Sequence, residues 1–132
     1  MIPSSCQNDA TPHPLRVTCL LPAFNEAPRI GQVLEVVTGH PLIDEVIVID
    51  DGSTDATANI AARKGVTVVM LGQNGGKARA LAAGVARARG DILVLLDSDL
   101  IGLTRHDVTR LIAPVLNGRA QTTLSLRGNA PR

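Results

Sequence analysis

Aromatic side chains are almost absent from this sequence of 132 residues, in which Phe24 is the single aromatic residue and Trp and Tyr do not occur. Proteins that hold single-stranded nucleic acid stack its bases on aromatic rings, so this class is disfavoured. Net charge is also small, because 13 Lys and Arg residues are balanced by 12 Asp and Glu residues. Such a balance provides no global field for nucleic acid or an anionic bilayer, and we expect no nucleic-acid partner.

Long apolar runs are also lacking, and none approaches the roughly 18 residues that a membrane-spanning helix needs. The opening MIPSSCQNDATPHP has neither the basic start nor the apolar stretch of a secretory signal. Cysteine is scarce: Cys6 lies in that opening segment and Cys19 in an apolar run, which favours a reducing compartment over a disulfide framework. We expect a cytoplasmic location, with the membrane surface as the alternative.

What the sequence does contain is an alternation of short β-rich runs and longer stretches with helical periodicity. The predicted strands are Arg16–Leu21, ended by Pro22, then Glu45–Ile49, Val66–Met70, Ile92–Leu96 and Thr122–Leu126. The predicted helices are Pro28–Val37, Asp55–Arg63, Lys77–Arg89 and one that starts at Thr104, contains a disruptive Pro114 and ends at Asn117–Gly118.

Uniformly apolar strands joined by helical crossovers predict an α/β fold, with a mainly parallel sheet covered by helices on both faces. A hydrophobic fraction of 45% is sufficient for one core. We expect one domain over residues 16–126, between a flexible tail of residues 1–15 and a second tail of residues 127–132.

In such sheets, ligands bind beyond the carboxyl ends of the strands. The loops expected there are Pro22–Glu26, Asp50–Asp55, Leu71–Lys77 and Asp97–Asp99. These loops hold most of the polar residues of the chain that could carry chemistry, so we expect the loops to converge on one site.

The most apolar strand ends in the sequence Asp97-Ser98-Asp99. A spacing of two residues places both carboxylates on one face of an extended chain, where they could share Mg²⁺ or Mn²⁺ with a substrate phosphate. The alternative is that one carboxylate caps a turn and the other is solvated.

The other two polar loops also allow structural interpretations. Asp50–Asp55 contains an Asp-Gly turn pair, and Thr54 or Asp55 would suit the cap of the following helix. Gly72–Ala78 departs from the Walker pattern in its glycine spacing and in having Ala78 where a hydroxyl is needed. It could still approach a phosphate, with Lys77 adding positive charge, or be a plain turn with a surface lysine.

Taken together and in order, Pro22-Ala-Phe-Asn-Glu26, Asp50-Asp-Gly-Ser-Thr-Asp55, Gly75-Gly-Lys77 with Ala80, and Asp97-Ser-Asp99 resemble the motifs of family 2 glycosyltransferases. The likeness extends from about Val17 to Leu126. It implies the GT-A fold, a three-layer sandwich that binds nucleoside-diphosphate sugars, here apparently truncated after the fifth strand.

The resemblance also implies roles for individual residues. Pro22, Ala23, Asn25 and Glu26 would help bind the nucleoside, Asp51 would contact the base, and Lys77 would lie beside the nucleotide. Asp97 and Asp99 match the DXD motif, in which the first carboxylate lies near ribose and metal and the last coordinates Mg²⁺ or Mn²⁺ at the diphosphate. The implied function is metal-assisted sugar transfer to an acceptor that the sequence does not identify.

Members of that family usually continue into an acceptor-binding part that carries a general base, whereas Leu111–Arg132 contains no Asp or Glu. We therefore expect a truncated enzyme, a fragment or part of an assembly, and no catalytic base is assigned. The alternative function is a non-catalytic nucleotide-sugar-binding domain; a nucleotidyltransferase is a weaker one. An open sheet of this kind exposes an edge, so we also expect self-association.

Overall fold

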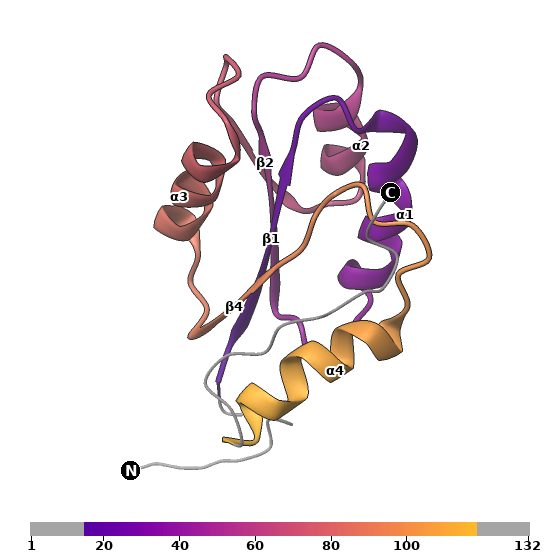
Figure 1. The fold of residues 1–132 in the computed structure, drawn as a ribbon, viewed down its shortest axis with the longest axis vertical. Helices are drawn as coiled ribbons and strands as arrows, with labels where there is room; N and C mark the ends of the chain where they lie inside the picture. The colour runs from indigo at the N-terminus through magenta and orange to yellow at the C-terminus, as the bar shows by residue number, and fades with distance from the viewer. Residues whose placement is uncertain (1–14, 119–132) are drawn as a thin grey trace.

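The computed structural model describes residues 15–118, in which strands and helices alternate along the chain (Figure 1). The strands are β1 (Val17–Ala23), β2 (Glu45–Asp50), β3 (Thr67–Met70) and β4 (Ile92–Leu95). The helices are α1 (Ala27–Thr38), α2 (Thr57–Arg63), α3 (Lys77–Arg87) and α4 (Arg105–Leu116). The first four predicted strands and all four predicted helices are confirmed, and the predicted strand Thr122–Leu126 lies outside the described residues.

The four strands form one parallel sheet in the order β3-β2-β1-β4. Strand β1 pairs with both β2 and β4, and all seven of its residues are buried. This explains why its sequence is apolar rather than alternating, because a parallel strand in the middle of a sheet has helices on both faces.

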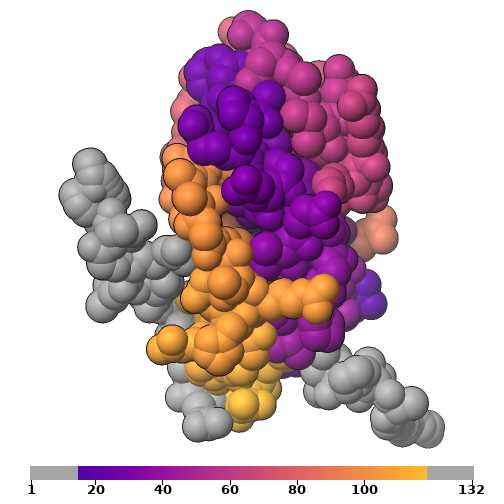
Figure 2. Space-filling model, turned by 90° about the vertical axis from the view of Figure 1, so that its right-hand side faces the viewer, coloured from indigo at the N-terminus to yellow at the C-terminus, as the bar shows by residue number. Residues whose placement is uncertain are grey.

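Helices cover the sheet from two sides, as predicted. Helix α3 packs on one face, against β1 and β2, with Leu20, Ile49 and Ala80 in its core. Helices α1, α2 and α4 lie on the other face, where Leu21, Leu34 and the rest of the larger core are buried. Figure 2 shows this second face, with α1 between the surfaces of α2 and α4. The described part is therefore a three-layer sandwich.

Strand β1 is longer than predicted, because it runs through Pro22 to Ala23 instead of ending before the proline. The main-chain oxygens of Leu20 and Pro22 both accept bonds from the β4 side, from Leu96 N–H and the Ser98 hydroxyl. The β1–β4 pairing ends at Leu20 and Leu95. The N–H that proline lacks therefore has no strand partner to lose.

Other boundaries differ by one or two residues. Helix α2 starts at Thr57 instead of Asp55, β3 starts at Thr67, α3 ends at Arg87, and β4 ends at Leu95. The Asp55 carboxylate accepts from the Thr57 N–H at 3.0 Å, so this residue precedes the helix and supports its first turn. Such side-chain bonds to the main chain compete with the helical conformation at the residue that makes them.

Helix α4 begins as predicted, with a reciprocal capping box between Thr104 and Asp107, and it continues through Pro114. It is also joined to the turn after α1 by His40, which is 4% exposed. The Nδ1 atom of His40 accepts from Leu42 N–H at 3.0 Å, so its Nε2 carries the proton that faces Thr109 Oγ1 at 2.9 Å. His40 thus has a structural role.

Strand β4 presents apolar side chains to solvent. Leu93 is 37% exposed and Leu95 is 52% exposed, and within residues 15–118 this strand is an edge of the sheet. The expected sheet edge is thus present in the described part of the chain, whereas self-association stays a prediction. Among the described residues, no helix is both long and apolar enough to cross a membrane.

The packing of α3 on the sheet predicts that Gly84→Val destabilises the protein. A β-carbon at Gly84 would lie 2.7 Å from Ile49 Cδ1 and 3.2 Å from Leu20 Cδ2. Overpacking of this kind costs about 1–3 kcal/mol, which urea unfolding would measure. Gly31→Val is the matched control, because Gly31 is also helical and has nothing within 4 Å of its β-carbon position. Equal stability of the two variants would contradict the prediction.

Cys19 predicts a specific loss of stability at alkaline pH. Burial raises the pKa of its thiol from 9.0 to about 12, so the folded state holds this proton more tightly than the unfolded state. The contribution of this thiol to the free energy of unfolding is complete below about pH 9. It is lost as pH rises towards 12, by up to about 1.4 kcal/mol per pH unit. Urea unfolding between pH 8 and 11, in a Cys6→Ser background, should show a flatter pH dependence for Cys19→Ala. Parallel curves would contradict this assignment.

Candidate functional site

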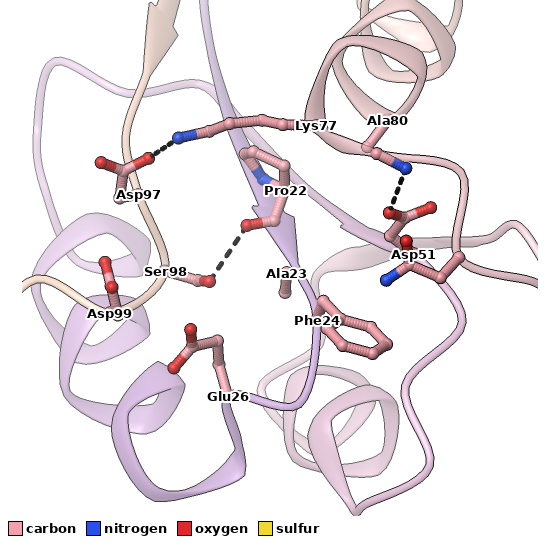
Figure 3. A pocket seen from close by; sticks show the side chains of 12 residues that line it. Pro22, Ala23, Phe24, Glu26, Asp51, Lys77, Ala80, Asp97, Ser98 and Asp99 are labelled. Atoms are coloured by element: carbon pink, nitrogen blue, oxygen red, sulfur yellow. Dashed lines mark hydrogen bonds and ion pairs between the residues drawn. The ribbon is translucent and has the colours of Figure 1, made fainter.

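The four polar loops meet at one cavity of about 390 Å³ beyond the carboxyl ends of β1, β2 and β4 (Figure 3). The predicted convergence is confirmed, and the volume is in the range of small-molecule sites. Eleven of the twelve lining residues belong to the four predicted loops: Pro22, Ala23, Phe24, Glu26, Asp51, Asn74, Gly76, Lys77, Asp97, Ser98 and Asp99. The twelfth is Ala80, in helix α3.

Asn25 is the predicted site residue that does not line the cavity. It adopts a positive φ of 53°, which asparagine tolerates better than most residues. Its side-chain Oδ1 accepts from Thr54 N–H at 2.8 Å, and its own N–H donates to Ser53 Oγ at 2.8 Å. Asn25 therefore joins the loop after β1 to the loop after β2.

The loop after β2 also caps helix α1. The Thr57 hydroxyl accepts from Glu26 N–H at 2.9 Å, and the Asp55 carboxylate accepts from Ala27 N–H at 3.1 Å. Hydrogen bonds, first the one from the Thr57 side chain, hold the pKa of Asp55 below its usual range. The structural interpretation is thus supported for Asp55, which accepts from one main-chain N–H of α1 and one of α2. It is not supported for Thr54, whose N–H and hydroxyl both face Asn25 Oδ1.

Asp51 fastens the glycine-rich loop. It is 5% exposed, and its two oxygens accept from the N–H groups of Gly75 and Gly76, each at 2.9 Å. Gly52 lets the two loops come together, because a β-carbon there would lie 2.6 Å from Asn74 N and the residue has φ of 83°. Asp51 therefore fixes the approach to α3, and each of its oxygens keeps a second lone pair for a ligand.

Asp97 and Asp99 both line the cavity, and the residue between them is an anchor. Ser98 is 4% exposed, and its hydroxyl donates to the Pro22 carbonyl at 3.0 Å. This bond joins β1 to the acidic turn just beyond the last paired residues of β4. With Ser98 turned inward, the carboxylates on either side are exposed at the cavity, as the spacing of two residues predicted.

The cavity is strongly acidic. Its lining holds four carboxylates, those of Glu26, Asp51, Asp97 and Asp99, whereas Lys77 is the only cationic side chain among the described residues that line it. Lys77 Nζ pairs with Asp97 Oδ1, and Glu26 pairs with Arg29 at 2.8 Å. In residues 15–118, no hydrogen bond or ion pair engages Asp99. A cation would therefore be attracted to this side chain.

Four lining residues lie in the predicted loops but were given no role from the sequence: Phe24, Asn74, Gly76 and Ser98. Phe24 is 43% exposed at the cavity, and the signal that could have found it is that the chain's one aromatic residue directly follows β1. Ser98 gave no such signal, because a serine between two aspartates indicates neither burial nor a partner 76 residues away.

A second cavity of about 400 Å³ lies at the amino ends of β2 and β3, near Glu45. Burial alone would raise the pKa of Glu45, but hydrogen bonds from Arg89 N–H and the Thr18 hydroxyl hold it below its usual range. These partners connect β1, β2 and the end of α3, so Glu45 serves the fold.

Comparison with known proteins places this geometry in a family. The sequence model for "Glycosyl transferase family 2" matches residues 18–129. Glucosyl-3-phosphoglycerate synthase of Mycolicibacterium paratuberculosis is 39% identical over 111 residues, which cover 77% of this chain and 34% of that protein. The 4,4'-diaponeurosporenoate glycosyltransferase of Staphylococcus aureus is 37% identical over 101 residues, covering 73% of this chain and 27% of that protein.

Solved structures give the same result. Glucosyl-3-phosphoglycerate synthase of Mycobacterium tuberculosis, in complex with Mn²⁺, UDP-glucose and phosphoglyceric acid, superposes with a TM-score of 0.72 at 37% identity. The match covers 80% of this chain and 41% of that one. Such likeness confirms the predicted α/β fold of the GT-A type over the described part.

The chain spans about a third of the length of the curated synthases it matches. Within that span, however, the family model covers nearly the whole of this sequence, and both relatives are named as sugar-transfer enzymes or synthases. The chain belongs to glycosyl transferase family 2.

Proposed function

We propose that this chain binds a nucleoside-diphosphate sugar together with a divalent cation and supplies the donor-binding part of a glycosyltransferase, over about residues 16–126. The observation that carries the proposal is the negative charge of the cavity, in which four carboxylates are opposed by a single lysine among the described residues. A diphosphate would be repelled from such a surface unless a cation came with it. An acidic cavity in this family is thus best suited to a metal–diphosphate complex.

Asp97 and Asp99 are the residues that would hold the cation. In residues 15–118 no group of three or more His, Cys, Asp or Glu side chains could hold a metal, so the protein offers few ligands. The two carboxylates of Asp97 and Asp99 fit Mg²⁺ or Mn²⁺, which prefer oxygen ligands and commonly complete their coordination with water and substrate phosphates. When bound, the cation supplies neutralisation of the negative charge that develops on the departing nucleoside diphosphate. The related synthase has been solved with Mn²⁺ and UDP.

The other half of the cavity would hold the nucleoside. Pro22, Ala23 and Glu26 line it, and Asn25 holds their loop against Thr54. Asp51 keeps lone pairs for a base N–H while its hydrogen bonds to Gly75 and Gly76 hold the neighbouring loop. Phe24 adds an exposed ring beside Asp51 (Figure 3), and aromatic faces are suited to stacking against a base.

Sugar transfer would then need an acceptor and a base that deprotonates it. The related synthase has been solved with UDP-glucose and phosphoglyceric acid together, which makes UDP-glucose the first donor to test here. The acceptor of this chain stays open, as does the base.

A second candidate function is nucleotide-sugar binding without transfer, and the carboxylates of the cavity favour it. Glu26 is paired with Arg29, and Asp51 is buried and accepts hydrogen bonds from two N–H groups. Asp97 and Asp99 are assigned to the cation. None of the four carboxylates in this cavity is therefore left to act as a general base.

The proposal predicts metal-dependent binding of a donor nucleotide. Calorimetric titration with UDP-glucose and other nucleoside-diphosphate sugars should show binding with Mn²⁺ and little without it. Asp99→Asn should weaken binding by about tenfold or more, since even the outer partners of metal ligands are worth 10–100-fold. Asp91→Asn is the matched control, because Asp91 precedes β4 at the opposite end and bonds to Arg16 N–H. Absence of metal-dependent binding for every donor would contradict the proposal.

The two candidate functions differ in turnover. If the described cavity lacks the base, the chain should bind UDP-glucose and Mn²⁺ yet release no UDP in the presence of candidate acceptors, phosphoglyceric acid included. A coupled assay for UDP would measure this, with the Asp99→Asn variant as the background. Acceptor-dependent release by the wild-type chain would eliminate the binding-only function and require a base outside the four carboxylates.

A further inference from the structure

Lys77 links the two sides of the cavity mouth. It is the first residue of α3, and its side chain reaches across Pro22 to the turn after β4, where Nζ pairs with Asp97 Oδ1 (Figure 3). The lysine thus forms an ion pair with one of the two carboxylates proposed to hold the cation.

This ion pair leaves the two acidic side chains unequal. Asp97 has a counter-ion, whereas no hydrogen bond or ion pair in the described part of the chain engages Asp99. A divalent cation shared by both carboxylates would lie close to the lysine ammonium as well. Because two positive charges at such short range repel, the cation and Lys77 compete for Asp97.

The exposure of this ion pair allows Lys77 to exchange Asp97 for another anionic partner. The side chains of Lys77 and Asp97 are 60% and 50% exposed, and ion pairs in water contribute little to stability. The lysine stem is long and flexible, so its ammonium can turn towards another anion nearby without moving the backbone of α3. The anion that a nucleoside-diphosphate sugar brings into the cavity is its diphosphate.

We infer that Lys77 is a displaceable counter-ion of Asp97, which weakens binding of the divalent cation alone and leaves Asp97 for the diphosphate when the nucleotide enters. This inference rests on the proposed function. It makes metal and nucleotide bind interdependently, because the nucleotide removes the competitor of the metal. Because such coupling is reciprocal, bound metal must raise the affinity for the nucleotide by the same factor as bound nucleotide raises the affinity for the metal.

A purely structural ion pair would have the opposite effect on the metal. If Lys77 only joined α3 to the turn after β4, its removal would loosen that turn and weaken cation binding. The sign of the change in Mn²⁺ affinity therefore separates the two roles.

The test is titration of the full chain with Mn²⁺ alone, followed by the loss of the electron paramagnetic resonance signal of free Mn²⁺. Lys77→Met should bind Mn²⁺ about three- to tenfold more tightly than wild type, because both the competitor and its charge are gone. Lys77→Arg keeps the charge and should stay near wild type. Lys64→Met removes a similar ion pair with Glu35, 2.6 Å long and away from the cavity, and should change the affinity less than twofold.

The second half of the test repeats the titration with saturating UDP. The wild-type gain in Mn²⁺ affinity on adding UDP should shrink in Lys77→Met by at least the factor that this variant gained without UDP. The inference would be overturned if Lys77→Met bound Mn²⁺ no more tightly than wild type, or if Lys64→Met gained as much affinity. It would also be overturned if neither wild type nor Lys77→Met bound Mn²⁺. The proposed function fails separately, if wild type shows no metal-dependent nucleotide binding at all.

Discussion

Because the four strands within residues 15–118 all run in the same direction, every loop that follows one of them lies at one edge of the sheet, and this single constraint brings the site together. Parallel pairing of β1 with β2 and β4 places Ala23, Asp51 and Asp97 near one another although long stretches of chain separate them. The apolar strands are what make the arrangement rigid, since β1 is buried along its whole length. Polar chemistry at the rim depends on an apolar core beneath it.

The loops are then held by side chains that bond to the main chain of a neighbouring loop. Ser53, Asp55 and Thr57 satisfy the N–H groups at the start of α1, and Asp51 does the same for the glycine-rich loop. Each such bond removes a donor that would otherwise be left unpaired at a helix start. The cavity therefore has a defined shape before any ligand arrives, which lowers the cost of ordering it on binding.

The sequence was sufficient to predict this fold because its strands and helices have clear periods and because parallel topology follows from their alternation. It predicted the rim residues for the same reason. It could not predict partners, since those are set by the tertiary arrangement. Asp55 bonds to the first turn of α1 as well as to that of its own helix, and Pro22 continues a strand because β4 no longer pairs beside it. Asn25 carries a polar side chain in the expected loop, yet that side chain serves Thr54 instead of the cavity. Spacing identifies which loop is polar, whereas the direction of each side chain depends on neighbours distant in sequence.

The hydrogen bond from Ser98 to the Pro22 carbonyl has a consequence for sequence variation at this edge. A pattern written as two aspartates around an arbitrary residue treats its middle position as free. Here that position accepts only a small side chain with a hydroxyl, because it is enclosed and must reach a carbonyl of the adjacent strand. Substitution is better tolerated at Phe24 or Asn74, which line the same cavity and are exposed, than at this serine.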